Sequence, residues 1–260
     1  MSIVTVLEKL YGSCLPATFE EFISRLFCGL SVQLRFAGQT DRGWIKLDIL
    51  GADKTVALSL LDREVGLVPA SLDCLEKFSV MRGKIVFSGK GQSELYVDLG
   101  LDSSETCDAV LSENHLRAQL ADGRNLSLQS LVELFCLYDN VPFEVKITKK
   151  VEVNNKNVEA ILSEHQLSLF RNWIRCRFDR LLVLGSFLSD VEQAVNSSRH
   201  SRDIIRTESL GVLEQVVLCK LGTDAVGLIP KLGRYLKSAV LVPFSPKKIL
   251  KAIGSQPFDW

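Results

Sequence analysis

The chain has 260 residues, of which 47% are hydrophobic and 24% charged, with 31 Lys and Arg against 31 Asp and Glu. This composition excludes disordered and fibrous proteins, and the length allows about two domains of roughly 100 to 200 residues each. No apolar run reaches the roughly 18 residues that span a bilayer, and the first residues do not form a signal peptide. We therefore expect a cytoplasmic protein that does not engage a membrane.

Residues 1–77 are predicted to form a small α/β module. Alternating apolar and polar residues predict strands over residues 3–10, 31–38 and 44–50. One helix is expected from Thr18, which can form a capping box with Glu21, and a second from Asp53 to Gly66. The order β-α-β-β-α is that of a ferredoxin-like, or split βαβ, domain.

Residues 78–165 are predicted to form a β-barrel. Short strands are expected over residues 79–87, 95–99, 109–111, 143–153 and 158–162. An acidic, helix-compatible insertion over residues 113–137 interrupts them. Five short strands with one interposed helix are typical of an OB-type barrel.

Residues 166–260 repeat the pattern of the first module. Strands are predicted over residues 181–185, 203–210, 212–220 and 239–244. Ser189 and Asp190 are expected to cap one helix. Another is expected after Asp224, either with Pro230 in its first turn or with a later start. The order β-α-β-β-α-β predicts a second ferredoxin-like module. The expected fold class is α+β, with a central OB-type barrel flanked by two small ferredoxin-like modules.

The balanced whole-chain charge hides a polarised distribution. The three segments hold 8, 9 and 14 basic against 10, 13 and 8 acidic side chains, so their net charges are −2, −4 and +6. The last segment concentrates its positive charge in Arg171, Arg175, Arg177, Arg180, Arg199, His200, Arg202 and Arg206. Arginine suits bidentate phosphate contacts, which favours a polyanion partner. A solvated face, paired with Asp179 and Asp203, is an equally supported alternative.

Cysteines and histidines do not indicate a metal site or a cofactor. The seven cysteines are scattered without a CxxC pair, and Cys28, Cys136 and Cys219 have apolar neighbours, which predicts free, buried thiols. None of the three histidines has a partner at zinc-site spacing. Phosphate-loop and nucleophile-elbow motifs are absent, and Gly89 and Gly91 are interpreted as turn residues. We expect no metal, no cofactor and no assigned catalytic residue.

The strands of the middle segment resemble the ribosomal-protein S-one type of RNA-binding OB domain. The resemblance rests on VMRGKIV at 80–86, LYVDLG at 95–100, DAVL at 108–111, VKI at 145–147 and AILS at 160–163. In that family, aromatic and basic side chains on the second and third strands stack on and clamp single-stranded RNA. The resemblance implies this role for Lys84, Phe87, Tyr96 and His115.

Over its whole length the chain also resembles an archaeal family of unknown function that carries such a domain. The resemblance rests on LRAQLADGR at 116–124, LFCLYDNVP at 134–142 and CKLGTDA at 219–225. It implies an RNA-linked cytoplasmic protein, associated with translation or RNA turnover.

The leading hypothesis is a non-catalytic RNA-binding protein whose barrel stacks bases and whose last module contacts phosphates. The phosphate contacts are predicted for Arg171, Arg175, Arg177, Arg199, His200, Arg202 and Arg206. The alternative is a protein–protein scaffold that docks to a ribosomal or polymerase-type complex. Its acidic surface is Glu105, Asp108, Glu113, Asp122 and Glu133. A third hypothesis is a Mg²⁺-dependent phosphodiesterase that uses Asp98, Asp102 and Asp108.

Overall fold

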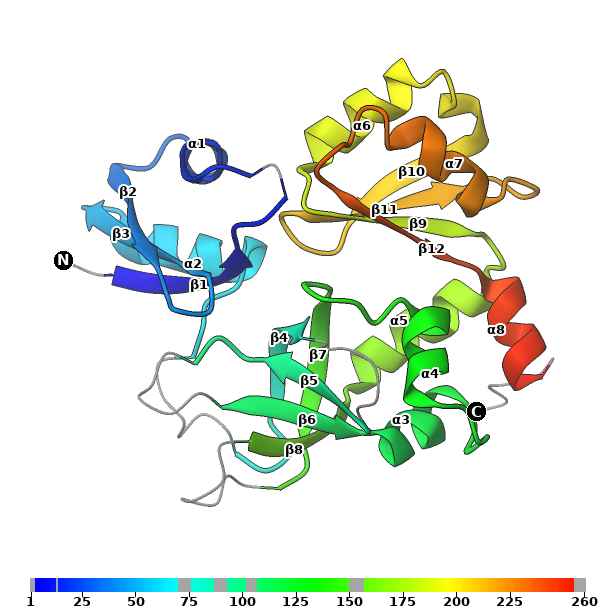
Figure 1. Ribbon diagram of the computed structural model, residues 1–260. Coiled ribbons are helices and arrows are strands. Elements are labelled where there is room, and N and C mark those ends of the chain that lie inside the picture. Colours follow the sequence, from blue (N-terminus) through cyan, green and yellow to red (C-terminus); the bar gives the residue numbers. More distant parts are fainter. Residues whose placement is uncertain are drawn as a thin grey trace.

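The computed structural model describes residues 3–12, 14–69, 76–86, 93–101, 107–149 and 157–254. Within these residues the chain forms a three-stranded sheet, a closed five-stranded barrel and a four-stranded sheet, with helices packed against them (Figure 1). The predicted α+β class, with a barrel between two small sheets, is confirmed at this level.

The first module consists of β1 (Ile3–Lys9), α1 (Pro16–Leu26), β2 (Val32–Gln39), β3 (Trp44–Gly51) and α2 (Lys54–Glu64). Its antiparallel strands lie in the order β1-β3-β2, as Figure 1 shows. Alternate residues of β3, Ile45, Leu47 and Ile49, are buried with the apolar faces of both helices. The predicted order of elements is confirmed.

The predicted capping box of the first helix is wrong. Helix α1 begins at Pro16, with Leu15 at the N-cap position, so Thr18 lies inside the first turn. Proline suits the first helical position because its φ is already helical and its missing N–H has no partner to lose there.

The barrel consists of β4 (Val80–Val86), β5 (Glu94–Asp98), β6 (Asp108–Ser112), β7 (Pro142–Ile147) and β8 (Asn157–Leu162). It closes in the order β4-β5-β6-β8-β7, with β6 and β8 parallel and the other neighbouring pairs antiparallel. Alternate residues such as Leu95, Val97 and Val145 point inward and are fully buried. The period-two pattern of the sequence therefore forms the barrel interior.

Two helices, rather than one, lie between β6 and β7. These are α3 (Glu113–Leu120) and α4 (Leu128–Phe135), capped by the hydroxyls of Ser112 and Ser127. Asp122 and Gly123 separate them with φ values of 50° and 72°, a left-handed backbone that cannot continue a helix.

The last module consists of β9 (Arg180–Leu184), α6 (Leu188–Ser197), a 3₁₀ turn (Ser201–Asp203), β10 (Ile204–Ser209), β11 (Glu214–Cys219), α7 (Ala225–Leu232) and β12 (Val240–Phe244). Its antiparallel sheet has the order β10-β11-β9-β12. Helices α6 and α7 cover one face of this sheet (Figure 1). Pro230 lies inside α7, beyond its predicted place in the first turn.

Two helices that the sequence analysis did not predict cover the opposite face of that sheet. They are α5 (Glu164–Arg175), which follows β8, and α8 (Pro246–Ile253), which follows β12. Trp173 of α5 packs edge-on against Phe244 of β12, with ring centroids 5.1 Å apart. One hydrophobic core thus runs from the barrel through α4, α5 and α8 to the last sheet. Both faces of this sheet are covered, so only its ends and edges are accessible.

Candidate nucleic-acid interface

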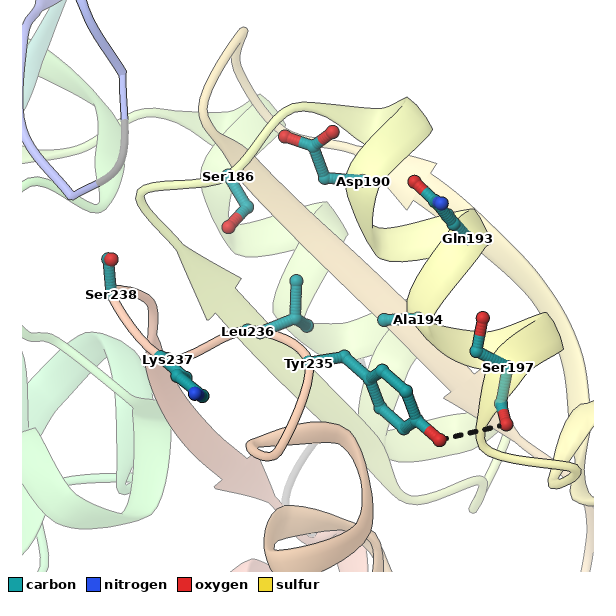
Figure 2. A pocket seen from close by; sticks show the side chains of 9 residues that line it. All are labelled: Ser186, Asp190, Gln193, Ala194, Ser197, Tyr235, Leu236, Lys237 and Ser238. Carbon is teal, nitrogen blue, oxygen red and sulfur yellow. Dashed lines mark hydrogen bonds between the residues drawn. The ribbon is translucent and has the colours of Figure 1, made fainter.

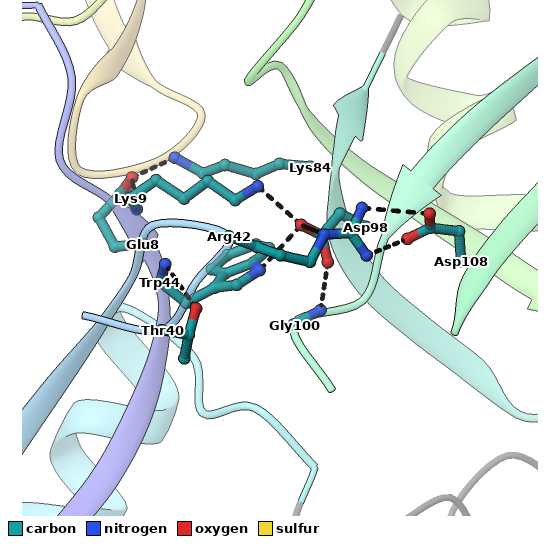
Figure 3. A network of polar contacts seen from close by, with 9 residues as sticks. All are labelled: Glu8, Lys9, Thr40, Arg42, Trp44, Lys84, Asp98, Gly100 and Asp108. Atoms are coloured by element: carbon teal, nitrogen blue, oxygen red, sulfur yellow. Dashed lines mark hydrogen bonds and ion pairs between the residues drawn. The ribbon is translucent and has the colours of Figure 1, made fainter. Parts of the chain in front are cut away.

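The first module is docked on the barrel through a carboxylate at the end of β5. Asp98 is buried, and its Oδ2 accepts hydrogen bonds from Lys9 Nζ at 2.7 Å and Trp44 Nε1 at 3.0 Å. Arg42 lies 3.2 Å from the same oxygen and also forms a bidentate pair with Asp108 at 2.6 and 3.1 Å (Figure 3). This module therefore occupies the outer face of β5 and β6 at the end where Asp98 and Asp108 pair.

A second buried cluster joins all three modules. We call Glu8, Tyr11, Lys84 and Glu214 the junction cluster. Lys84 Nζ, on β4 of the barrel, donates to Glu214 Oε1 at 2.7 Å and to Glu8 Oε1. Tyr11 Oη donates to the same Glu214 oxygen, and Lys84 Nζ lies 5.3 Å from the centre of the tyrosine ring.

Burial and charge perturb the ionisation of this cluster strongly. Desolvation and the nearby Glu8 raise the pKa of Glu214 to about 7. Burial opposes the charged form of Lys84, but Glu214 and Glu8 outweigh it, so the pKa of this ammonium is raised. Burial and the Glu214 carboxylate raise the pKa of the Tyr11 phenol. Glu214 Oε2 is buried without a hydrogen-bond partner in the described part of the chain.

The structure places the four predicted barrel residues in different environments. Lys84 is only 2% exposed and is paired with two carboxylates, so we leave it out of any RNA surface. Tyr96 is half-buried on the outside of β5, and its hydroxyl donates to Glu94 at 2.8 Å, which raises the pKa of the phenol. His115 is exposed in the first turn of α3. Phe87 lies outside the described residues.

The predicted arginines gather at one end of the last sheet because of the strand topology. Antiparallel pairing places Arg206 of β10 and Arg180 of β9 on either side of Leu218 in β11. Lys220 N donates to Asp203 O at 2.8 Å, which fixes Lys220 beside the start of β10. The exit of α5 lies at the same end, because it leads through residues 176–179 into β9.

We call this region the basic end. It comprises Arg175, Arg177, Arg199, His200, Arg202, Arg206 and Lys220. All are exposed except His200, which is half-buried. Arg171 is half-buried one helical turn before Arg175. Lys220 was missed by the sequence analysis, although its place at the end of a predicted strand, beside the arginine-rich turn, was a usable signal.

Within the part of the chain that the structure describes, most cations of the basic end form no ion pair with a carboxylate. His200 Nδ1 pairs with Asp203 at 2.7 Å, and this contact lowers the pKa of the aspartate. Arg206 pairs with Glu208 at 2.5 Å. The other five residues of the basic end form no ion pair in the described part of the chain. They are Arg175, Arg177, Arg199, Arg202 and Lys220. Of the two acids named in the alternative of a solvated face, Asp203 pairs with His200, whereas Asp179 accepts a hydrogen bond from Ser245 Oγ at 3.0 Å.

Arg180 has a structural role and is not part of the basic end. It is buried, and its Nη1 donates to the carbonyl oxygens of Trp173 at 3.0 Å and Phe178 at 2.9 Å. Its guanidinium also lies 5.1 Å from the centre of the Trp173 ring. Burial lowers the pKa of this guanidinium.

The basic end and the Tyr96 surface do not form one patch. Strand β5 lies on the lower left of Figure 1. The start of β10, which follows α6, and the end of β11, which precedes α7, lie on the upper right. An RNA that contacted both would have to extend across the molecule.

Two cavities accompany these surfaces. The junction cleft, of about 340 Å³, lies between β4, β7, α5 and the β10–β11 turn, with Lys84, Glu8 and Glu214 in its wall. A second pocket of about 350 Å³ lies between α6 and residues 235–238, where Tyr235 Oη donates to Ser197 O at 3.0 Å (Figure 2). Its charged lining residues, Asp190 and Lys237, are both exposed.

The carboxylates considered for Mg²⁺ are engaged elsewhere. Asp98 and Asp108 are paired with Lys9 and Arg42, and Asp102 lies outside the described residues. In the part of the chain that the structure describes, no group of three or more His, Cys, Asp and Glu side chains is placed to hold a metal ion. The prediction of buried thiols is confirmed for Cys136 and Cys219 but is wrong for Cys28, which is exposed.

Comparison with known families gives one match, to the DUF2110 C-terminal domain of an uncharacterised family, over residues 178–243. The matched part holds the whole four-stranded sheet with α6 and α7, except for the last residue of β12. It contains the basic-end residues from Arg199 to Lys220, but Arg175 and Arg177 lie before it. A comparison with curated proteins finds no match. None of the helices in the described ranges is long and apolar enough to cross a membrane.

Proposed function

We propose that this chain is a non-catalytic, cytoplasmic RNA-binding protein that contacts RNA phosphates through the basic end. The observation that carries the proposal is the convergence, at one end of a sheet, of five exposed cations that form no ion pair within the described residues. They come from the end of α5, the turn after it, the turn before β10 and the residue after β11, and are Arg175, Arg177, Arg199, Arg202 and Lys220. Exposed guanidinium groups bind phosphate oxygens in pairs, and their contacts release counterions from the nucleic acid. An association with translation or RNA turnover stays part of the proposal.

We infer that the barrel is of the OB type and that the last module is ferredoxin-like. Support for the first is the ring order, which is 1-2-3-5-4 in the numbering of the barrel, with a parallel pair between its third and fifth strands. Support for the second is the order 2-3-1-4 of the antiparallel sheet, with a helix after its first and third strands. The S-one-like identity of the barrel and an archaeal source stay predictions.

A titration with labelled RNA at several salt concentrations tests this proposal. The Arg199→Ala, Arg202→Ala double variant should bind a single-stranded RNA more weakly. The negative slope of its log K against log salt should become shallower by about 1.4, since each lost phosphate contact removes about 0.7 from its magnitude. Arg25 and Arg63 are exposed on α1 and α2 of the first module, so their double alanine variant is the matched control. Equal slopes for both variants would contradict the role of the basic end.

The scaffold alternative rests on a smaller acidic surface than the sequence suggested. Asp108 pairs with Arg42, and Glu113 pairs with Arg117 at 2.7 Å while it accepts from Leu128 N. Asp122 and Glu133 are the exposed acids that the structure describes in the insertion. A pull-down with and without nuclease separates the two functions, because a protein partner retained after nuclease treatment supports the scaffold.

A further inference from the structure

Phe78, at the entry to β4, combines an exposed ring with a strained backbone. Its side chain is 61% exposed, and its φ is 73°. A bulky residue in this left-handed region is a conformational outlier that costs free energy, and little burial compensates for it here. Stability therefore gives no reason for phenylalanine at this position.

The backbone of Phe78 is hydrogen-bonded to the barrel. Phe78 N donates to Ile147 O at 2.8 Å, and Ile147 N donates to Ser79 O at 3.0 Å, so the residue extends the pairing of β4 with β7. These backbone hydrogen bonds hold the left-handed conformation of Phe78 in place beside the barrel.

Two ammonium groups lie over this ring as cation–π contacts. Lys77 Nζ lies 4.9 Å and Lys146 Nζ 5.6 Å from the ring centre. Neither lysine forms an ion pair within the described ranges, because the neighbouring carboxylates Glu144 and Glu159 pair with Arg82 and Lys149. Val80, 53% exposed, lies opposite Lys146 and extends the apolar surface.

We propose that Phe78 stacks on a base of single-stranded RNA while Lys77 and Lys146 contact the adjacent phosphates. A base that stacks on the exposed ring takes the place of the ammonium groups, which then reach the phosphates on either side of that base. Exposed aromatic rings with cations close by bind unpaired nucleotides with little sequence preference. The unpaired cations favour a polyanion over an apolar protein surface. This inference rests on the proposed function and adds a stacking site on β4 and β7, away from the β5 and β6 strands on which stacking was predicted.

The test compares three full-length proteins by fluorescence anisotropy: the wild type, Phe78→Gly and Phe78→Tyr. The probes are a labelled 12-nucleotide oligo(U) and a blunt RNA duplex of the same length. Loss of one stacked base should weaken binding of oligo(U) by about 5- to 150-fold in the glycine variant. The tyrosine variant should bind oligo(U) like the wild type, and duplex binding should be unchanged in both.

A thermal unfolding measurement separates a binding role from a structural one. Glycine adopts a φ of 73° without strain, so Phe78→Gly should unfold at the same temperature as the wild type or a higher one. Tyr235, a 51% exposed aromatic residue of the last module, provides the control, since Tyr235→Ala should leave oligo(U) binding unchanged.

The outcomes distinguish the two proposals. Failure of the wild type to bind either RNA would remove the proposed function and this inference with it. Wild-type binding that Phe78→Gly does not weaken would overturn only the stacking site and would assign the exposed ring to a protein contact. Weaker binding accompanied by a lower unfolding temperature, without rescue by tyrosine, would make Phe78 a structural residue.

Discussion

Replacement of Lys84 by methionine tests whether the junction cluster holds the three modules together. The ammonium is buried between Glu8 and Glu214, and methionine has a similar length but no charge. The variant leaves two buried carboxylates facing each other without a cation. Breaking a buried ion pair in this way typically costs about 3 to 5 kcal/mol. We expect a loss of that size, with normal RNA binding at the basic end once the variant is folded.

Urea unfolding followed by tryptophan fluorescence measures the effect. With an m value of about 3 kcal/mol per molar urea, the expected loss lowers the midpoint by about 1 M or more. A Glu8→Gln replacement in the Lys84→Met background should recover part of the stability, because it removes one of the two facing charges. An unchanged midpoint in Lys84→Met, combined with weaker RNA binding, would refute the structural role and return Lys84 to the RNA surface.

Three further predictions follow from single residues. The folded-state pKa of Glu214, raised to about 7, lies above its unfolded value near 4.5. The stability that this difference contributes is present below pH 4.5 and is lost as the pH rises through 7. In Glu214→Gln, the free energy of unfolding should fall less steeply between pH 5 and 8, by a slope that corresponds to at most one bound proton. Gly83→Ala places a Cβ against the carbonyl oxygen of Asp98, and calorimetry should show a destabilisation of about 1 to 3 kcal/mol. The exposed Cys28 should react with a thiol reagent in the native protein, whereas the buried Cys136, with its pKa raised to about 12 by burial, should react only after unfolding; equal rates would contradict the packing of α4.

The local pattern of the sequence predicted most strands but not every helix. Period-two alternation predicted the strands of the barrel, because inward and outward positions differ in burial. Helix α5 was not predicted, although Ser163 caps it and its apolar residues recur at helical spacing. Helix α8 was not predicted because its first residue, Pro246, closely follows a predicted strand, where proline is typical of a strand end, although proline also begins helices.

The candidate site depended on contacts that sequence position does not reveal. Lys84 looks like a barrel surface lysine, and only the approach of Glu8 and Glu214, which lie 76 and 130 residues away, makes it a buried one. Phe78 was not predicted as a site residue because its positive φ and its exposure are properties of the folded structure that the sequence does not reveal. Segment charge did predict the last module as the basic one, because exposed arginines retain their charge wherever the fold places them.

Ultraviolet cross-linking of the wild-type protein to a photoreactive single-stranded RNA, followed by mass spectrometry of the tryptic peptides, tests the central claim most directly. The account predicts cross-links in peptides that cover residues 199–220 of the basic end, reduced by the Arg199→Ala, Arg202→Ala variant. Cross-links confined to the first module or to the Tyr96 side of the barrel, with none at residues 199–220, would contradict it.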